Sequence, residues 1–245
     1  MKYPRLWSRL YNTPLAIGFD KLRVIEGVFR KHLDEPLAAL NRPDSNGRSS
    51  YSVSGGGVAV IPVQGTLVQR SSGLDAESGL TSYASIGAQI REAMADTQVR
   101  AVLMEIDSPG GEVAGLFDLV DTIYQARSIR PVWAIANENA YSAAYAIASA
   151  AERLTLPRSA GVGSIGVVAM HMDQSAKDAK QGYVYTPVFA GDRKIDGSEH
   201  FPLTAEAKFS LQAEVDRLYD LFVSTVARNR NIDASVVRAT EAGWL

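Results

Sequence analysis

Cysteine is absent from this 245-residue sequence, and histidine is scarce, with only His32, His171 and His200. The first absence excludes disulfide bonds, thiolate metal sites and a cysteine nucleophile. The scarcity of histidine means that any histidine-based mechanism must use one of these three residues. A large charge of one sign is also lacking, since 25 Lys and Arg stand against 27 Asp and Glu, for a net charge of -2. This balance gives no indication of a nucleic-acid or membrane-surface partner.

Long apolar runs are missing as well. Charges recur through the N-terminal region, at Lys2, Arg5, Arg9, Asp20, Lys21 and Arg23. We therefore predict neither a signal peptide nor a transmembrane helix, and we expect the protein to stay in the cytoplasm where it is made. The composition, 46% hydrophobic and 21% charged, is typical of a globular domain.

The chain is predicted to divide into an N-terminal arm and one main domain. Residues 41–57 are rich in Pro, Ser, Asn and Gly and end on three consecutive glycines, which is typical of a flexible linker. We place the arm and its linker at residues 1–57, with helical spacing at 24–29. The main domain is placed at residues 58–245.

Strand and helix patterns alternate through the main domain. The predicted strands are residues 58–63, 99–106, 132–136, 154–156, 164–168 and 184–189. The predicted helices are residues 86–95, 113–124, a small-residue helix from 142, 173–181 and 204–228. Alternation at this spacing predicts an α/β fold with a largely parallel sheet and flanking helices.

Three loops that follow predicted strands are the expected places for a site, because open α/β sheets bind ligands beyond the carboxyl ends of their strands. They are residues 107–111 (Asp-Ser-Pro-Gly-Gly), 137–144 (Asn-Glu-Asn-Ala-Tyr-Ser-Ala-Ala) and 161–168 (Gly-Val-Gly-Ser-Ile-Gly-Val-Val). The third loop lacks the lysine of a phosphate-binding loop and does not match the dinucleotide fingerprint, so no nucleotide site is predicted. None of the loops requires a metal or an organic cofactor.

The first two loops each allow a structural and a chemical interpretation. Gly110 and Gly111 let the backbone approach a ligand closely, and they equally suit a simple turn. Ser142 stands where a strand gives way to a helix. There it can cap the helix, or it can react beside free N–H groups that would stabilise an oxyanion. Taken singly, each segment favours the structural interpretation.

Taken together and in order, the motifs resemble the signal-peptide peptidase A family (S49) of serine peptidases, which has the ClpP/crotonase fold. The order is a strand ending in Asp-Ser-Pro-Gly-Gly, a serine before a small-residue helix, Gly-Ser-Ile-Gly-Val-Val (residues 163–168), and a lysine in Gly-Asp-Arg-Lys-Ile-Asp-Gly (residues 191–197). Within that family, residues 60–68, 131–137 and 194–197 are most similar to the head-maturation proteases of lambda-type tailed phages.

The resemblance implies a serine endopeptidase with a Ser–Lys dyad. Ser142 is the expected nucleophile, Lys194 its general base, and Ser164 the hydroxyl that orients the amine. A lysine serves as a base at neutral pH only when it is desolvated, because burial disfavours the ammonium form. His171 would permit a Ser–His arrangement like that of ClpP, but the motif around Lys194 favours the lysine.

The resemblance also implies an oxyanion site and a peptide substrate. The backbone N–H groups of Gly111 and Ala143 are the expected oxyanion donors, with Gly110 beside the substrate. Family members often have glycines after the nucleophile, whereas this chain has Ala143 and Ala144. The substrate would be an extended polypeptide bound at a strand edge by main-chain hydrogen bonds.

In the phage setting, the expected substrates are scaffold, portal or capsid protein and the protease itself, processed in the host bacterial cytoplasm inside the assembling procapsid. Relatives form rings, in some of which the serine and lysine come from neighbouring subunits, so we expect a homo-oligomer. The chain ends earlier than family members usually do. It is therefore expected to be a truncated form, an autoprocessed product, or the protease part of a protease–scaffold fusion.

Two other functions stay open on the sequence alone. A crotonase-like acyl-CoA enzyme shares the fold and holds a thioester oxyanion with paired N–H groups. Against it, no carboxylate pair is clearly placed at the three loops. A capsid-assembly scaffold with a vestigial site is the non-enzymatic alternative, and the intact Ser142 and Lys194 argue against it.

Overall fold

The computed structural model describes residues 11, 13–17, 51–70 and 80–244. Its strands are β1 (Leu15–Ile17), β2 (Ser52–Val53), β3 (Val58–Gln64), β4 (Thr66–Val68), β5 (Leu80–Ser82), β6 (Ala101–Ser108), β7 (Gly110–Glu112), β8 (Val132–Tyr141), β9 (Arg153–Thr155) and β10 (Gly161–Gly163). Its helices are α4 (Tyr83–Ala95), α5 (Leu116–Ala126), α6 (Ala143–Ser149), α7 (Ser175–Lys180), α8 (Ala205–Arg230) and α9 (Ala234–Arg238).

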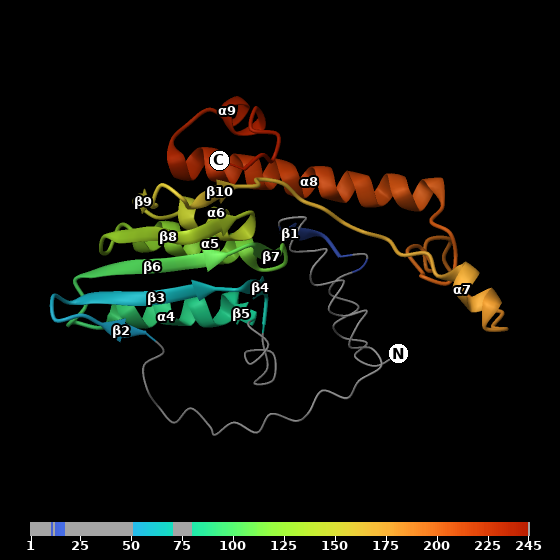
Figure 1. The fold of residues 1–245 in the computed structure, drawn as a ribbon, viewed down its shortest axis with the longest axis horizontal. Coiled ribbons are helices and arrows are strands. Elements are labelled where there is room, and N and C mark those ends of the chain that lie inside the picture. The colour runs from blue at the N-terminus through green and yellow to red at the C-terminus, as the bar shows by residue number, and fades with distance from the viewer. Residues whose placement is uncertain (1–10, 12, 18–50, 71–79, 245) are drawn as a thin grey trace, which may run out of the picture.

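A mostly parallel sheet forms the centre of the protein, in the order β10-β8-β6-β3-β2 with β9 beside β8. Only β2 runs antiparallel to its neighbour. Buried and half-buried residues alternate along β3 and β6, because successive side chains of a strand point to opposite faces. The buried face packs under α4, α5 and α6 (Figure 1). The α/β fold predicted from the sequence is therefore confirmed.

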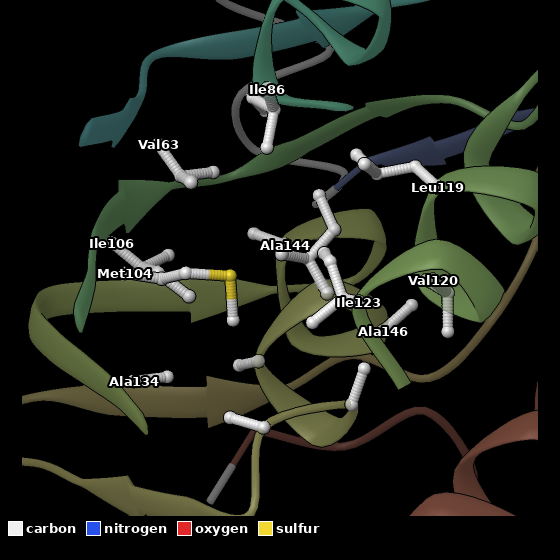
Figure 2. Close-up of a cluster of buried hydrophobic side chains, with 14 of the residues drawn as sticks. Val63, Ile86, Met104, Ile106, Leu119, Val120, Ile123, Ala134, Ala144 and Ala146 are labelled. Atoms are coloured by element: carbon white, nitrogen blue, oxygen red, sulfur yellow. The ribbon is translucent and has the colours of Figure 1, made fainter. Parts of the chain in front are cut away.

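The core lies between this sheet face and the three helices. Figure 2 shows large side chains of β3 and β6 meeting those of α4 and α5, while α6 presents alanines such as Ala144 and Ala146. Small side chains let a helix approach its neighbours closely. The helix that follows Ser142 is consequently fixed against the body of the domain.

A second, smaller sheet lies beyond the carboxyl ends of the central strands. Its order is β1-β7-β4-β5, with β1 antiparallel and the other pairs parallel. The chain passes from β3 to β4 through Gly65 and from β6 to β7 through Pro109. The loop residues 107–111 therefore enter this small sheet, beside the point where β8 ends.

The long helix α8 joins the domain only through its C-terminal half. The Thr204 hydroxyl accepts a hydrogen bond from the N–H of Ala207 at 3.1 Å and so caps the beginning of the helix. Phe222 is buried and packs edge-on against Phe117 of α5. The N-terminal half projects from the domain, together with residues 171–204 before it (Figure 1); we call residues 171–204 the outlying segment. No helix among the described residues is long and apolar enough to cross a membrane.

Two strand predictions are wrong. Residues 164–168 do not form a strand, because Ser164 has a positive φ of 54° and ends β10 at Gly163; Val168 makes only an isolated bridge. Residues 184–189 form no strand and are exposed. The helix predicted at 24–29 lies outside the described residues, as does the linker up to residue 50.

The predicted division at residues 57 and 58 stays a prediction. Part of the predicted arm nevertheless belongs to the sheets, since Leu15–Ile17 pair with β7 and Ser52–Val53 pair with β3. Residues 51–57 form β2 and the turn into β3. They are therefore part of the folded domain and not of a flexible linker.

Candidate active site

Ser142 occupies a strained position between β8 and α6. Its backbone has φ 54° and ψ -118°, in a region that residues with a side chain seldom adopt. It is the first residue before the helix, yet its side chain makes no capping hydrogen bond. The helix-cap interpretation of this serine is therefore wrong. Strain of this kind persists only where the surrounding structure enforces it, and it is concentrated at functional sites.

The loop after β10 holds Ser142 in place. The N–H of Ser142 donates to the carbonyl of Gly163 at 2.8 Å. Its Oγ lies 3.5 Å from the carbonyl oxygen of Gly166, a long and weak contact. The residue as a whole is 1% exposed. The hydroxyl is thus oriented by the backbone of the 161–168 loop without a strong bond that would restrain it.

Gly110 and Gly111 lie where no side chain would fit. A methyl group on Gly110, whose φ is +100°, would be 3.0 Å from the Cβ of Ser142. One on Gly111 would be 1.8 Å from the carbonyl oxygen of Leu67 in β4. Buried Ser108 fixes this loop, since its Oγ donates to the Gly65 carbonyl at 2.7 Å and accepts the Gly110 N–H at 3.2 Å. The structure therefore places Gly110 beside Ser142, with Gly111 next to it in β7 against the backbone of β4.

Ala143 is the first residue of α6 and is fully buried. The first N–H groups of a helix have no acceptor within it. Ala143 therefore lies next to Ser142, with its N–H outside the helical bonding pattern. Its role as an oxyanion donor, like that of Gly111, stays a prediction.

The strand β7 ends at a residue with a buried carboxylate, Glu112. Glu112 accepts a hydrogen bond from the N–H of Gln69 at 2.7 Å, and its backbone carbonyl accepts one from the Tyr83 hydroxyl at 2.6 Å. Burial, and secondarily the charge of Glu112, raise the pKa of Tyr83 well above its ordinary value. These contacts secure β7 to α4 beneath the site.

Lys194 is not brought to Ser142 within the chain. It lies exposed in the turn 191–197, where its N–H donates to the Gly191 carbonyl at 2.9 Å. Its neighbour Arg193 is tied to the beginning of α8, by bonds of 2.7 Å to the Ser210 hydroxyl and 3.2 Å to the Glu206 carbonyl. Figure 1 shows the beginning of α8 on the right, at the end of its projecting half, well away from the central sheet that contains β8.

Ser164 lies in the loop that holds Ser142. Its N–H donates to the Gly243 carbonyl at 2.9 Å, and its carbonyl accepts from the N–H of Gly166 at the same distance. His171 is half-buried where the outlying segment begins. The sequence pointed to this glycine loop, but it gave no sign that the carbonyls of Gly163 and Gly166 would be the groups that contact the serine.

Comparisons with known proteins relate this chain to a peptidase family and to two phage proteins. The model of peptidase family S49 matches residues 125–244, a span that includes Ser142, Ser164 and Lys194. Head-tail preconnector protein GP5 of Enterobacteria phage P21 is 42% identical over 209 residues, covering 85% of this chain and 41% of the relative. Capsid assembly protease C of Escherichia phage lambda is 39% identical over 206 residues, covering 83% and 47%.

The chain thus spans less than half the length of these phage relatives. Among solved structures, a mutant of ClpP1 from Listeria monocytogenes matches over 76% of this chain and 81% of its own, with a TM-score of 0.43 and 16% identity. That likeness is too weak to indicate function or assembly.

Proposed function

Residues 125–244 of this chain belong to peptidase family S49, and from that premise we propose that the protein is a serine endopeptidase with Ser142 as its nucleophile. The observation that carries the proposal is the strained, uncapped Ser142 between β8 and α6. A hydroxyl in that position is presented by the backbone and is beside backbone N–H groups, as acyl transfer requires.

In the proposed mechanism, the Ser142 Oγ attacks the carbonyl carbon of the scissile peptide bond. The hydroxyl proton passes to the base, and the oxyanion is held by the N–H groups of Gly111 and Ala143. Collapse of this intermediate expels the amine, which takes the proton from the base and leaves an acyl-enzyme. Water then hydrolyses the ester and restores Ser142.

Lys194 is the proposed base, and we place it in the site of a neighbouring copy of the chain. Within one chain the turn that carries Lys194 is tied to the far end of α8. Docking of that turn over a second copy's Ser142 would also desolvate the lysine, which its role as a base needs. Ser164, in the loop beside Ser142, is the proposed partner of the amine.

The proposed substrates are polypeptides of a phage head: scaffold, portal or capsid protein, and the chain itself. The support is the similarity to the phage P21 and phage lambda proteins, the latter named a capsid assembly protease. The acyl-CoA alternative has no support among these relatives. A scaffold without catalysis remains the alternative that the experiment must separate.

The test is labelling and self-cleavage. The wild-type chain, Ser142→Ala and the exposed-serine control Ser224→Ala are each treated with a fluorophosphonate and weighed intact, with and without a phage scaffold protein. We expect the wild type and the control to gain one label and to give fragments, and Ser142→Ala to do neither. Equal patterns in all three proteins would leave the non-catalytic scaffold as the better proposal.

The base is tested separately, because His171 is the competing candidate. Lys194→Ala should abolish cleavage, whereas His171→Ala should retain it. The exposed Lys208→Ala on α8 is the matched control for loss of a lysine. Activity that survives the change at Lys194 and disappears with the change at His171 would reverse the assignment.

A further inference from the structure

The short strand β1 lies between two parts of the candidate active site. On one edge it pairs antiparallel with β7, with Leu15 opposite Glu112 and Ile17 opposite Gly110. On its other edge, Leu15 donates to the Val168 carbonyl at 2.8 Å and accepts from the Val168 N–H at 2.9 Å. Three residues from the N-terminal region are therefore inserted between β7 and the loop after β10.

This insertion lies directly beside the nucleophile. The position that a methyl group on Gly110 would take is 2.3 Å from the carbonyl oxygen of Ala16 and 3.0 Å from the Cβ of Ser142. The backbone of β1 and the side chain of Ser142 thus flank the same glycine. Figure 1 shows β1 next to β7, at the carboxyl end of the central strands.

The surroundings of β1 have the form of a peptide-binding groove. Without β1, the outer edge of β7 and the polar groups of Val168 would face each other across a gap one strand wide. An extended peptide adds to such an edge through main-chain hydrogen bonds. Its side chains would follow those of β1, where Leu15 and Ile17 pack by Val168 and Met170, and Ala16 points to the opposite side and is 0% exposed.

We propose that Leu15–Ile17 is a tethered occupant of the peptide-substrate groove, and that a substrate must displace it to reach Ser142. This rests on the proposed function of Ser142 as the nucleophile. The groove then takes an extended peptide with a small residue at the position of Ala16 and aliphatic residues on either side. The N-terminal region regulates the peptidase by competing for its substrate site.

Tethering makes this competition effective although only three residues pair. A linked segment has an effective concentration of roughly millimolar, so a free peptide of equal affinity for the groove is excluded until its own concentration approaches that value. Release of β1 should therefore raise the apparent affinity for an added peptide by about tenfold or more.

The first experiment locks the strand in place. The chain has no cysteine of its own, so Leu15→Cys combined with Val168→Cys introduces a single possible disulfide. Paired residues of this kind have Cα atoms about 5.5 Å apart, which a disulfide spans. Oxidation should abolish binding of a fluorescent peptide with the sequence of residues 11–17, and reduction should restore it. Failure to crosslink, or binding that is unchanged by oxidation, would overturn the proposal.

The second experiment releases the strand, in a Ser142→Ala background that cannot cleave the peptide. Leu15→Pro removes the N–H that donates to Val168, whereas the control Leu15→Ala shortens the side chain and keeps the N–H. Fluorescence anisotropy should show about tenfold tighter peptide binding with Leu15→Pro than with Leu15→Ala, and no binding of a scrambled peptide. Equal affinities would reject the tethered occupant.

These readouts separate the two proposals, because peptide binding does not need catalysis. If the disulfide blocks binding but no protein is labelled at Ser142, the groove assignment holds and the peptidase function fails. If Ser142 is labelled at the same rate with the disulfide formed or reduced, the peptidase function holds and the tethered occupant is rejected.

Discussion

The residues around Ser142 and those around Lys194 differ in almost every physical respect. Ser142, Ala143 and Ala144 are buried in the domain core, and the conformation of the serine is enforced by its neighbours. The outlying segment has no strand, and it presents Val184 and Val188 at 90% and 97% exposure. The surroundings of the proposed nucleophile are therefore built by the folding of one chain, whereas one chain alone does not bring the proposed base, Lys194, to it. We propose that assembly with a second copy does so.

The outlying segment is nonetheless ordered by contacts of its own. Asp178 lies 2.9 Å from the Nδ1 of His200, and the ring of Tyr185 stacks on that histidine with centroids 3.7 Å apart. These polar and aromatic contacts hold the segment together, so its apolar side chains stay directed outward. A surface of that kind suits docking onto another protein.

The largest expected effect is the peptidase activity regained when two inactive variants are mixed. Ser142→Ala lacks the proposed nucleophile, and Lys194→Ala, which lacks the proposed base, should lose about 10²–10⁴-fold in kcat. If the dyad forms between copies, an equal mixture regains about a quarter of the wild-type sites, because each active site can take its serine and its lysine from different chains. Peptidase assays of each variant and of the mixture check this. An inactive mixture of assembled proteins would show that one chain supplies both residues. Lys194 would then be positioned within its own chain, as Ser142 is.

A glycine-to-alanine substitution beside Ser142 and another in the outlying segment should show how differently the two regions are packed. Gly111→Ala forces a methyl group against the Leu67 backbone, and we expect it to lower the free energy of unfolding by about 3 kcal/mol and to abolish activity. Gly182→Ala, at φ +79° in open space on the outlying segment, should cost only about 1–2 kcal/mol of backbone strain. Urea unfolding measures both. Equal losses would mean that the two regions are packed alike.

The central sheet could be predicted from the sequence because buried parallel strands are themselves apolar runs, as in β3 and β6. The candidate site was found through the order of four motifs, and not through local chemistry, since a serine before a helix usually caps it. The backbone angles of Ser142 and Ser164 could not be predicted, because nothing in a serine signals a positive φ. For the same reason the strand expected at 164–168 was wrong.

The strand β1 was missed for a different reason. Leu15–Ile17 is too short to show any periodicity, and its pairing depends on β7 and Val168, which lie about a hundred residues or more along the chain. The separation of Lys194 from Ser142 is equally non-local, since it results from the projection of α8. The order of the motifs identifies Ser142 and Lys194 as candidate residues. It does not indicate whether one chain or two chains bring them together.

Substitution of the exposed valines should affect assembly without affecting the fold. Val184→Ser with Val188→Ser removes apolar surface that a partner would bury, and each change should weaken self-association by about tenfold. The free energy of unfolding of the single chain should stay within about 0.5 kcal/mol. Analytical ultracentrifugation measures the association. Val236→Ser on α9, also exposed, is the control. Unchanged association would remove these side chains from the proposed contact.

The smallest expected change in the free energy of unfolding is that of Tyr83→Phe, which tests how firmly β7 is held beneath the site. Tyr83→Phe deletes the 2.6 Å hydrogen bond to the Glu112 carbonyl and should cost about 1 kcal/mol near pH 8. Burial raises the pKa of Tyr83 above its ordinary value, so the folded state keeps the phenol proton after the unfolded state has lost it. This contribution is complete below about pH 10 and is lost as the pH rises through the folded-state pKa.

The wild type should therefore lose stability more steeply above pH 10 than Tyr83→Phe does, and the difference between the two should narrow as the pH rises. Urea unfolding at several pH values measures the two slopes, and Tyr183→Phe, an exposed phenol of the outlying segment, is the control. Parallel curves would mean that Tyr83 reaches solvent when it ionises. In that case β7 would not be rigidly supported, and the difference between the fixed region around the proposed nucleophile Ser142 and the exposed region around the proposed base Lys194 would be smaller than the structure indicates.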